Sequence, residues 1–459
     1  MKRGFLNSSK PKVHPQGPST TPAATPSPGI DLGEIPRAGL GRLAIGKQNV
    51  ELPEGFDEDV ALLEREIQAQ GMIVHTTVPF DKALPGEHTT ECIFHPGSKE
   101  VLMGLSGFPQ PMVKRVGKKS PVVVKEASGM GLGVFATRGI KAGELIFSER
   151  PLLVGGQALP TALRASWTRE QKSQSSLNQL EKMLAVAVDR MSDEDKAAYM
   201  ALKNSHLEDG SGPLAGIYRT NGLGIEGLRP ELKKGDATAF CSGVGNLVSR
   251  LNHSCSRNVT AHWNMLTFSF QVFAVRDIAA DEELTYQYCP IEGSTAERNE
   301  QLKPYDFICA CPSCKDPESD ARRANLKKSY PPSMIIPAWL SGNAPQADSK
   351  LLPECRRQMD ILEREGMQGT SRYFQVSVAG FVACVALGDA QSASEWARKL
   401  ARIRWVDKVP KDIESFVDPK SRAYKAHPVW RKKIDGGVGF DVMVKLAEMG
   451  IGSVVNLPH

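Results

Sequence analysis

With 459 residues, of which 41% are hydrophobic and 24% charged, the chain has the composition of a soluble protein and the length for roughly two to four folding units. Its 57 Lys and Arg against 52 Asp and Glu give a net charge of +5, too small to indicate a nucleic-acid-binding face, and its longest apolar run is shorter than the ~20 residues of a membrane span. Nine cysteines, an odd number, favour the reducing nucleus or cytoplasm and metal ligation over a disulfide framework.

The N-terminal part carries the weakest signals. Residues 1–37 are rich in Pro, Ser and Thr, so we expect a disordered tail, and Met1–Lys10 lacks the apolar region of a signal peptide. Residues 38–119 form a segment of unclear fold. It contains a predicted amphipathic helix over Asp57–Ile67 and two short predicted strands around a Pro-Gly turn, over Glu91–His95 and Glu100–Met103.

A predicted strand over Pro121–Lys125 leads into Gly129–Ala136, which reads Gly-Met-Gly-Leu-Gly-Val-Phe-Ala. The glycine spacing superficially resembles a dinucleotide-binding loop, but Val134–Ala136 continues as strand and no helix opens there. Without a helix N-terminus there is no phosphate cradle. By itself the stretch therefore predicts a tight turn between strands.

Helical patterns interrupt the strands over residues 155–236. Apolar residues recur at helical spacing between Leu177 and Ala187, and Ser192, followed by three acidic residues, is typical of a helix N-cap. The segment contains no cysteine.

Two blocks further along carry the strongest pattern. Arg250–Cys255 reads Arg-Leu-Asn-His-Ser-Cys, and Glu282–Tyr288 reads Glu-Glu-Leu-Thr-Tyr-Gln-Tyr. Between them, Leu266–Val272 alternates apolar and polar residues with the period of a half-buried strand.

Three cysteines, Cys309, Cys311 and Cys314, fall within six residues and cannot all pair with one another. They can supply three ligands of a tetrahedral zinc site. Spacing does not fix the fourth ligand, for which Cys255 and Cys289 are both candidates. Since a structural zinc supplies folding energy, we expect this loop to depend on the metal.

The remaining residues, 316–459, predict a helical C-terminal domain with the potential to bind partner proteins. Helices are expected over Leu352–Gly366, Ser371–Leu387 and Ala390–Arg404. The last two are similar to one tetratricopeptide-type hairpin, but no 34-residue period repeats.

Four of these blocks, in this order, resemble the SET domain of protein lysine methyltransferases. They are the glycine stretch with Ile140–Glu144 after it, the Asn-His-Ser-Cys block, the Glu-Glu-Leu-x-x-x-Tyr block, and the cysteine segment that follows Glu297-Arg298. The last is similar to the post-SET segment of the SET-and-MYND branch, although the cysteine-free insert lacks the MYND zinc module of that branch. The resemblance covers about residues 121–315, less than half of the chain.

The fold implied by the resemblance is of the α+β class. Small sheets around a pseudoknot would form the SET domain over residues 120–315, with the helical insert at 155–236 and the zinc-binding post-SET segment at 297–315. The helical C-terminal domain would follow.

The function implied is methyl transfer from S-adenosylmethionine to a lysine of a histone tail or of another protein. A lysine ammonium, with a pKa of about 10.4, must first lose a proton, and a dry channel beside a sulfonium cation favours the neutral amine. Positioning and polarised oxygens complete the chemistry. The alternatives are a non-catalytic SET scaffold that binds partner proteins and a zinc-ribbon protein that binds nucleic acid.

The family motifs also imply roles for single residues. The catalytic candidates are Tyr288, the central one, Tyr286 on the same strand face, and Tyr305 in the lysine channel. The cofactor-binding candidates are Gly131, Leu132, Gly133, Asn221, Asn252, His253 and Phe307. The zinc ligands are Cys255, as the family uses the cysteine of Asn-His-Ser-Cys, with Cys309, Cys311 and Cys314.

Two positions depart from the family pattern. Leu223 stands where the family often has an aromatic residue, and Arg257 stands where it usually has proline. Without the fixed φ of proline, the loop after Cys255 can take a different shape.

Overall fold

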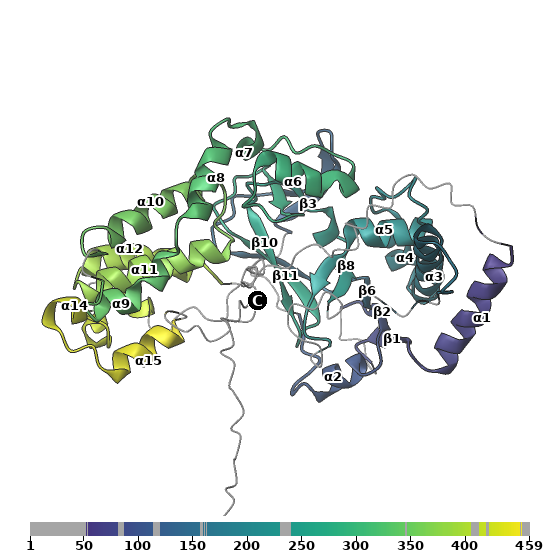
Figure 1. Ribbon diagram of the computed structural model, residues 1–459, viewed down its shortest axis with the longest axis horizontal. Coiled ribbons are helices and arrows are strands. Elements are labelled where there is room, and N and C mark those ends of the chain that lie inside the picture. The colour runs from purple at the N-terminus through teal and green to yellow at the C-terminus, as the bar shows by residue number, and fades with distance from the viewer. Residues whose placement is uncertain are drawn as a thin grey trace, which may run out of the picture. The chain divides into compact units, whose positions relative to one another are not determined.

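The computed structural model describes residues 52, 54–80, 87–112, 120–156, 159, 161, 163–229, 240–344, 347–404, 413–418, 422–449 and 451. The predicted tail over residues 1–37 and the end of the insert from residue 230 lie outside the described residues. The described helices and strands confirm the α+β class (Figure 1). None of the described helices is long and apolar enough to cross a membrane.

The N-terminal segment contains α1 (Phe56–Ala69), β1 (Val74–Val78), β2 (Thr90–Phe94) and α2 (Ser98–Gly104). These elements confirm the helix predicted from Asp57 and the strand predicted from Glu91. The strand predicted over residues 100–103 is wrong, because these residues belong to α2. A left-handed Gly97, with φ of 90°, turns the chain directly into that helix, and four apolar-rich residues do not distinguish a short helix from a strand.

Three small sheets form the centre of the fold (Figure 1). The first has the order β1-β2-β6-β8-β7, with β6 at Leu153–Gly156, β8 at Cys241–Val244 and β7 at Leu223–Ile225. The second has the order β10-β11-β5, with β10 at Val259–Asn264, β11 at Ser269–Ala274 and β5 at Leu145–Glu149. The third has the order β3-β4-β12-β9, with β3 at Val122–Ala127, β4 at Gly131–Ala136, β12 at Glu283–Tyr286 and β9 at Asn252–His253.

The third sheet brings three sequence motifs side by side. Strand β12 pairs antiparallel with the glycine strand β4 and parallel with β9, so that Thr285 lies opposite Asn252 and Tyr286 opposite His253. The side chain of Asn258 stabilises β12. It accepts a hydrogen bond from the N–H of Thr285 at 2.7 Å and donates one to the carbonyl of Glu283 at 2.8 Å. Residues more than a hundred positions apart in the chain thereby form one compact corner.

Strand β11 differs in part from the prediction. It begins at Ser269, because Phe268 adopts a left-handed turn with φ of 48°, and it is buried at all six positions. The half-buried strand predicted from its alternation is therefore wrong in burial. The reason is that both faces of β11 are covered: Phe270 and Val272 pack in one core cluster, and Phe273 packs in the cluster that contains the C-terminal helices. The buried hydroxyl of Ser269 is 2.7 Å from that of Thr267.

The insert folds as α3 (Arg169–Asp189), α4 (Asp193–Met200) and α5 (Pro213–Asn221). Ser192 caps α4 as predicted, and its hydroxyl accepts from the N–H of Asp195. Apolar residues of the three helices pack with β2 and β6 in one core cluster, which fixes the end of α5 beside the third sheet.

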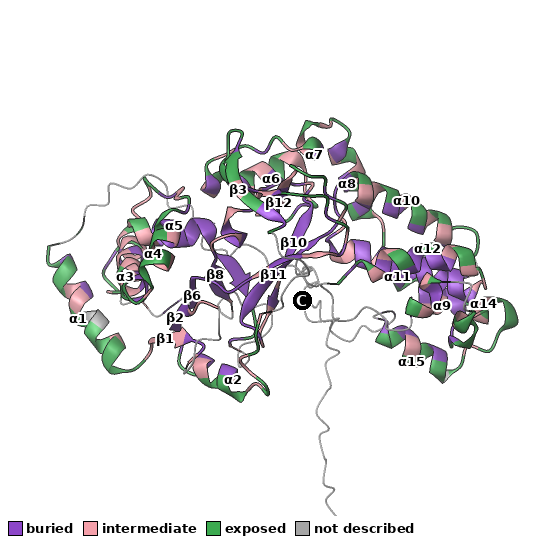
Figure 2. Ribbon diagram, turned by 180° about the vertical axis from the view of Figure 1, so that it is seen from behind, coloured by how far each residue is buried: buried purple, intermediate pink, exposed green. Residues whose placement is uncertain are grey.

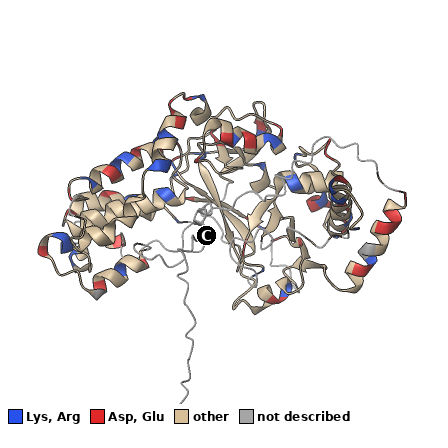
Figure 3. Cartoon of the chain, viewed as in Figure 1, with Lys and Arg blue, Asp and Glu red and all other residues tan. Residues whose placement is uncertain are grey.

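The C-terminal part is helical, with the predicted helices confirmed as α10 (Leu351–Arg364), α11 (Ser371–Ala386) and α12 (Ala390–Ala401). Helix α11 is buried along nearly its whole length (Figure 2). Its core cluster extends to Cys255 and Tyr305, so these helices pack directly against the region around Cys255. Acidic and basic side chains are interspersed along the C-terminal helices (Figure 3).

Candidate functional site

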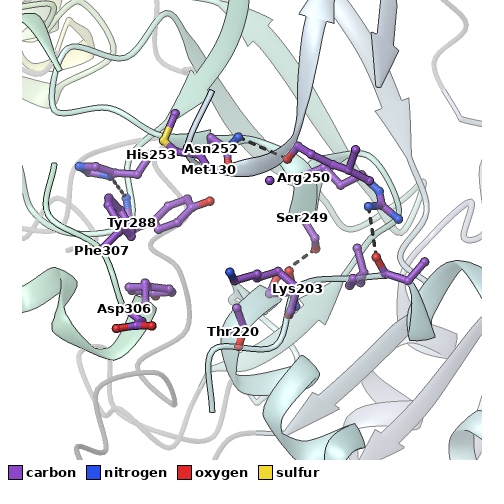
Figure 4. Close-up of a pocket in the computed structure, with 17 residues that line it drawn as sticks. Met130, Lys203, Thr220, Ser249, Arg250, Asn252, His253, Tyr288, Asp306 and Phe307 are labelled. Atoms are coloured by element: carbon purple, nitrogen blue, oxygen red, sulfur yellow. Dashed lines mark hydrogen bonds between the residues drawn. The ribbon is translucent and has the colours of Figure 1, made fainter. Parts of the chain in front are cut away.

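A cavity of about 300 Å³ lies where the glycine turn, the β9 corner, two parts of the insert (the loop after α4 and the end of α5) and the segment after α6 (Thr295–Leu302) meet (Figure 4). Eight of the ten residues predicted for catalysis or cofactor binding line this cavity. They are Gly131, Leu132, Asn221, Asn252, His253, Tyr288, Tyr305 and Phe307.

The other two predicted residues, Gly133 and Tyr286, do not line the cavity. Tyr286 is fully buried in the core beneath the third sheet. A Cβ atom at Gly133 would lie 2.4 Å from the Glu283 carboxylate and 2.9 Å from the amide nitrogen of Asn252. Gly133 therefore acts through close approach of the backbone, which lets Asn252 sit against the glycine strand.

Asn252 links the glycine turn to β12. Its Nδ2 donates to Glu283 Oε1 at 2.7 Å. It also donates to the carbonyl of Leu132 at 3.3 Å (Figure 4). Burial raises the pKa of the Glu283 carboxyl, and the hydrogen bond from Asn252 opposes that rise. The amide oxygen of Asn252 is then left to accept a hydrogen bond at the cavity wall.

Aromatic rings form one side of the cavity. The Tyr288 hydroxyl donates to the carbonyl of Leu251 at 2.8 Å. Its ring centroid lies 4.9 Å from that of Tyr305, 5.3 Å from that of His253 and 6.2 Å from that of Phe307. These contacts fix the orientation of the phenol, whose oxygen can still accept a hydrogen bond from an amine.

Asn221 fixes the opposite side. Its Nδ2 donates to the carbonyls of Lys203 and Ile217, each at 2.7 Å, while its own carbonyl accepts from the Ser249 hydroxyl at 3.0 Å. The side chain thus ties the loop after α4 to the end of α5. The departure at Leu223 lies fully buried in β7, two residues beyond.

Sequence reasoning missed three charged residues of the cavity wall, Lys203, Arg250 and Asp306. Burial lowers the pKa of Arg250, whose guanidinium donates to the carbonyl of Ala201 at 3.4 Å. Arg250 lies two residues before Asn252 of the Asn-His-Ser-Cys block, and that position was its signal. Lys203 and Asp306 carried no sequence signal. Lys203 reaches the wall from a loop of the insert, and Asp306 reaches it through its own left-handed backbone, with φ of 57°.

Four cysteine sulfurs gather beside the β9 corner. All lie within 4.8 Å of one another, and they belong to Cys255, Cys309, Cys311 and Cys314. Cys255 Sγ is 3.8 Å from Cys309 Sγ and 3.7 Å from Cys314 Sγ. A tetrahedral zinc ion with Zn–S bonds of about 2.3 Å holds its sulfurs about 3.8 Å apart. The spacing of these sulfurs therefore fits zinc.

The side-chain donors around Cys255 also favour a metal site at these sulfurs. Arg298 Nε lies 3.1 Å from Cys255 Sγ and its Nη2 lies 3.4 Å from Cys314 Sγ, with the guanidinium fully buried. Hydrogen bonding with neighbouring thiols, led by Cys309, raises the pKa of Cys255, whereas hydrogen bonding led by Cys255 lowers the pKa of Cys311. Cys289, the other candidate ligand, is not in the group, and its thiol faces the carbonyl of Arg298 at 3.9 Å.

Comparisons with known proteins agree with this geometry. The family description "SET domain" matches residues 131–289. The histone-lysine N-methyltransferase set5 of Schizosaccharomyces pombe is 29% identical over 276 residues, covering 59% of this chain and 73% of that protein. The N-lysine methyltransferase SMYD2-B of Xenopus laevis is 24% identical over 169 residues, covering 34% and 39%.

A third relative matches over a shorter stretch. The histone-lysine N-methyltransferase ASHR1 of Arabidopsis thaliana is 40% identical over 78 residues, which is 16% of this chain and 15% of that protein. The match to the SET family description runs from the glycine turn to the residue after Tyr288, and so includes β4, β9 and β12. Residues 131–289 thus match the SET domain, and over parts of its length the chain is similar to set5 and to the SMYD2 methyltransferases.

Proposed function

We propose that the chain is an S-adenosylmethionine-dependent protein lysine methyltransferase. The observation that carries this proposal is the cavity wall within and just after the SET domain, where Tyr288, Asn252 and Phe307 surround one space of about 300 Å³. Relatives are named for histone lysines and for protein lysines in general, so the proposed substrate is a lysine of a histone or of another protein. Nothing in the cavity favours the non-catalytic scaffold.

The wall suits the cofactor that the family implies. Phe307 and His253 offer ring faces for adenine, and Asn252 and Asn221 offer amide oxygens, the chemistry that a nucleoside carrying an amino-acid group requires. When bound, S-adenosylmethionine supplies the methyl group and a sulfonium cation.

The chain's own residues would prepare the substrate amine. Aromatic walls from Tyr288 and Tyr305 exclude water, and loss of water favours the neutral form of an entering lysine. The Tyr288 hydroxyl, held toward Leu251, would accept an N–H of that amine and aim its lone pair. No general base on the protein is required if the amine loses its proton to solvent before it enters.

The four thiols are proposed to hold one structural zinc ion. All four positions of a tetrahedron would be taken by sulfur, which leaves no open position for substrate. The metal would join the segment carrying Cys309 to the β9 corner and so complete the cavity wall at Phe307.

S-adenosylmethionine or its demethylated product is expected to raise the melting temperature of the zinc-loaded protein. At one hundred times the dissociation constant, ligand binding adds about 2.7 kcal/mol to the free energy of unfolding. Phe307→Ala should reduce this shift. Ile308→Ala is the matched control, because that neighbouring side chain is 81% exposed and does not line the cavity. No shift in the wild type at millimolar ligand would refute the cofactor assignment.

A further inference from the structure

His253 connects two parts of the site through opposite edges of one ring. Its Nδ1 accepts a hydrogen bond from the backbone N–H of Tyr288 at 2.9 Å (Figure 4), and its Nε2 lies 3.3 Å from Cys255 Sγ. The residue is only 3% exposed, so water does not compete freely for either bond. The imidazole therefore spans the distance between the proposed catalytic tyrosine and a proposed zinc ligand.

The hydrogen bonds determine which ring nitrogen carries the proton. A backbone N–H can only donate, so Nδ1 of His253 must be the acceptor. In a neutral imidazole the proton is then on Nε2, which donates to the sulfur of Cys255. Arg298 Nε also donates a hydrogen bond to that sulfur, at 3.1 Å. Two N–H donors on one sulfur suit a thiolate, which is the form that binds a metal.

Tyr288 depends on this ring because the sheet no longer holds it. The pairing of β12 with β9 ends at Tyr286, opposite His253, and strand β12 ends there too. Tyr288 lies two residues beyond the last pair, and its N–H donates to the imidazole where a strand neighbour would otherwise accept. The position of its backbone is therefore tied to the position of the His253 ring.

We propose that His253 is a positioning residue with two separable roles: its Nδ1 fixes the backbone of Tyr288, and its Nε2 supports the metal centre through Cys255. This inference rests on the proposed function and adds roles for His253 beyond cofactor binding. Groups that hydrogen-bond to metal ligands typically change metal affinity 10–100-fold when lost. A displacement of about 1 Å at a catalytic group can cost on the order of a hundredfold in rate.

Two substitutions separate the two bonds. In His253→Asn the amide oxygen takes the place of Nδ1 and can accept from Tyr288, but nothing reaches Cys255. In His253→Gln the amide nitrogen reaches the place of Nε2 and can donate to Cys255, but the acceptor for Tyr288 is lost. His75→Asn on β1 is the control for general effects of replacing an imidazole.

The two readouts do not require methyl transfer. Zinc affinity is measured by competition with a chromogenic chelator, and the placement of Tyr288 by fluorine NMR of zinc-saturated protein labelled with 3-fluorotyrosine. The chain has eight tyrosines, and the signal missing in Tyr288→Phe identifies the residue. His253→Asn should bind zinc 10–100-fold more weakly with its Tyr288 signal near the wild-type position. His253→Gln should keep its zinc affinity and shift the signal.

Unchanged zinc affinity and an unchanged Tyr288 signal in both variants would overturn the proposal, and so would parallel losses of both in each variant. If the variants do not fold, nitrogen NMR of histidine-labelled wild type decides. A proton on Nε2 alone, with NMR magnetisation transfer between Nδ1 and the amide proton of Tyr288, supports the proposal. A proton on Nδ1 overturns it. If the wild type binds cofactor but the two variants do not show these opposite effects, only this inference is overturned. If the wild type binds no cofactor, the proposed function is overturned.

Discussion

Tyr288→Phe is expected to reduce methyl transfer on the order of a hundredfold, like the loss of one preorganised polar contact in an active site. The substitution removes the hydroxyl that donates to Leu251 and keeps the ring that packs against Tyr305 and Phe307. One typical hydrogen bond contributes about 1 kcal/mol to stability, so the fold should survive. Cofactor binding should persist, since Phe307 and the glycine turn are unchanged.

The measurement is single-turnover methyl transfer from labelled cofactor to a substrate found on a protein array, with calorimetric cofactor binding alongside. Tyr286→Phe is the matched control, because the same atom is removed two residues away in a core position outside the cavity. It should cost less, because the Tyr286 side chain lies outside the cavity. Unchanged turnover in Tyr288→Phe would remove this residue from the mechanism, and equal losses in both variants would point to packing.

Short motifs predicted the centre of the site because each motif forms a strand of one sheet. The glycine turn, the Glu-Glu-Leu block and the Asn-His pair occupy the adjacent strands β4, β12 and β9, an order in space that differs from their order in the chain. From β4 and β9, Gly131, Leu132, Asn252 and His253 line the cavity.

The rest of the wall could not be predicted, because it depends on long-range packing. Lys203 is placed by the hydrogen bond from Asn221 to its carbonyl, a contact that no periodicity encodes. The same limit explains the false strand at residues 100–103 and the unexpected burial of both faces of β11.

Arg257 shows how a departure from the family pattern is accommodated. Its side chain is fully buried, and a Cβ atom at Gly369 would lie 2.7 Å from its Nη2. The neighbouring Ser256 hydroxyl donates to the carbonyl of Glu365 at 2.7 Å. The loop after Cys255 is therefore shaped by contacts with residues around the end of α10, where the family relies on the fixed φ of a proline.

Those contacts continue into the metal centre. Buried Glu365 accepts from Arg323 Nε at 2.9 Å, and Arg323 Nη2 donates to the carbonyl of Cys255 at 3.0 Å. Desolvation opposes ionisation of Glu365, but its hydrogen bonds from Ser319 and the two adjacent arginines outweigh burial and lower its pKa. A charged, buried network thus joins the C-terminal helices to one proposed zinc ligand.

Loss of zinc is expected to have the largest effect on stability. Structural zinc contributes about 10–16 kcal/mol of apparent binding free energy in small zinc domains, and here the metal would close the loop between Cys255 and the cysteines after residue 308. The wild type should contain one zinc ion per chain. Cys255→Ser should release it, lower the melting temperature and abolish cofactor binding, because Phe307 lies between the β9 corner and Cys309.

Cys289→Ser is the matched control for this prediction. Its thiol is also buried and lies near Arg298, but it faces a carbonyl and stands outside the group of four sulfurs. The variant should therefore keep its zinc ion and its cofactor affinity, with only the modest stability loss of a buried polar replacement. Metal analysis and thermal melting of both variants test the assignment together. Zinc retained in Cys255→Ser and lost in Cys289→Ser would reverse the choice of the fourth ligand, because the two cysteines compete for one tetrahedral position.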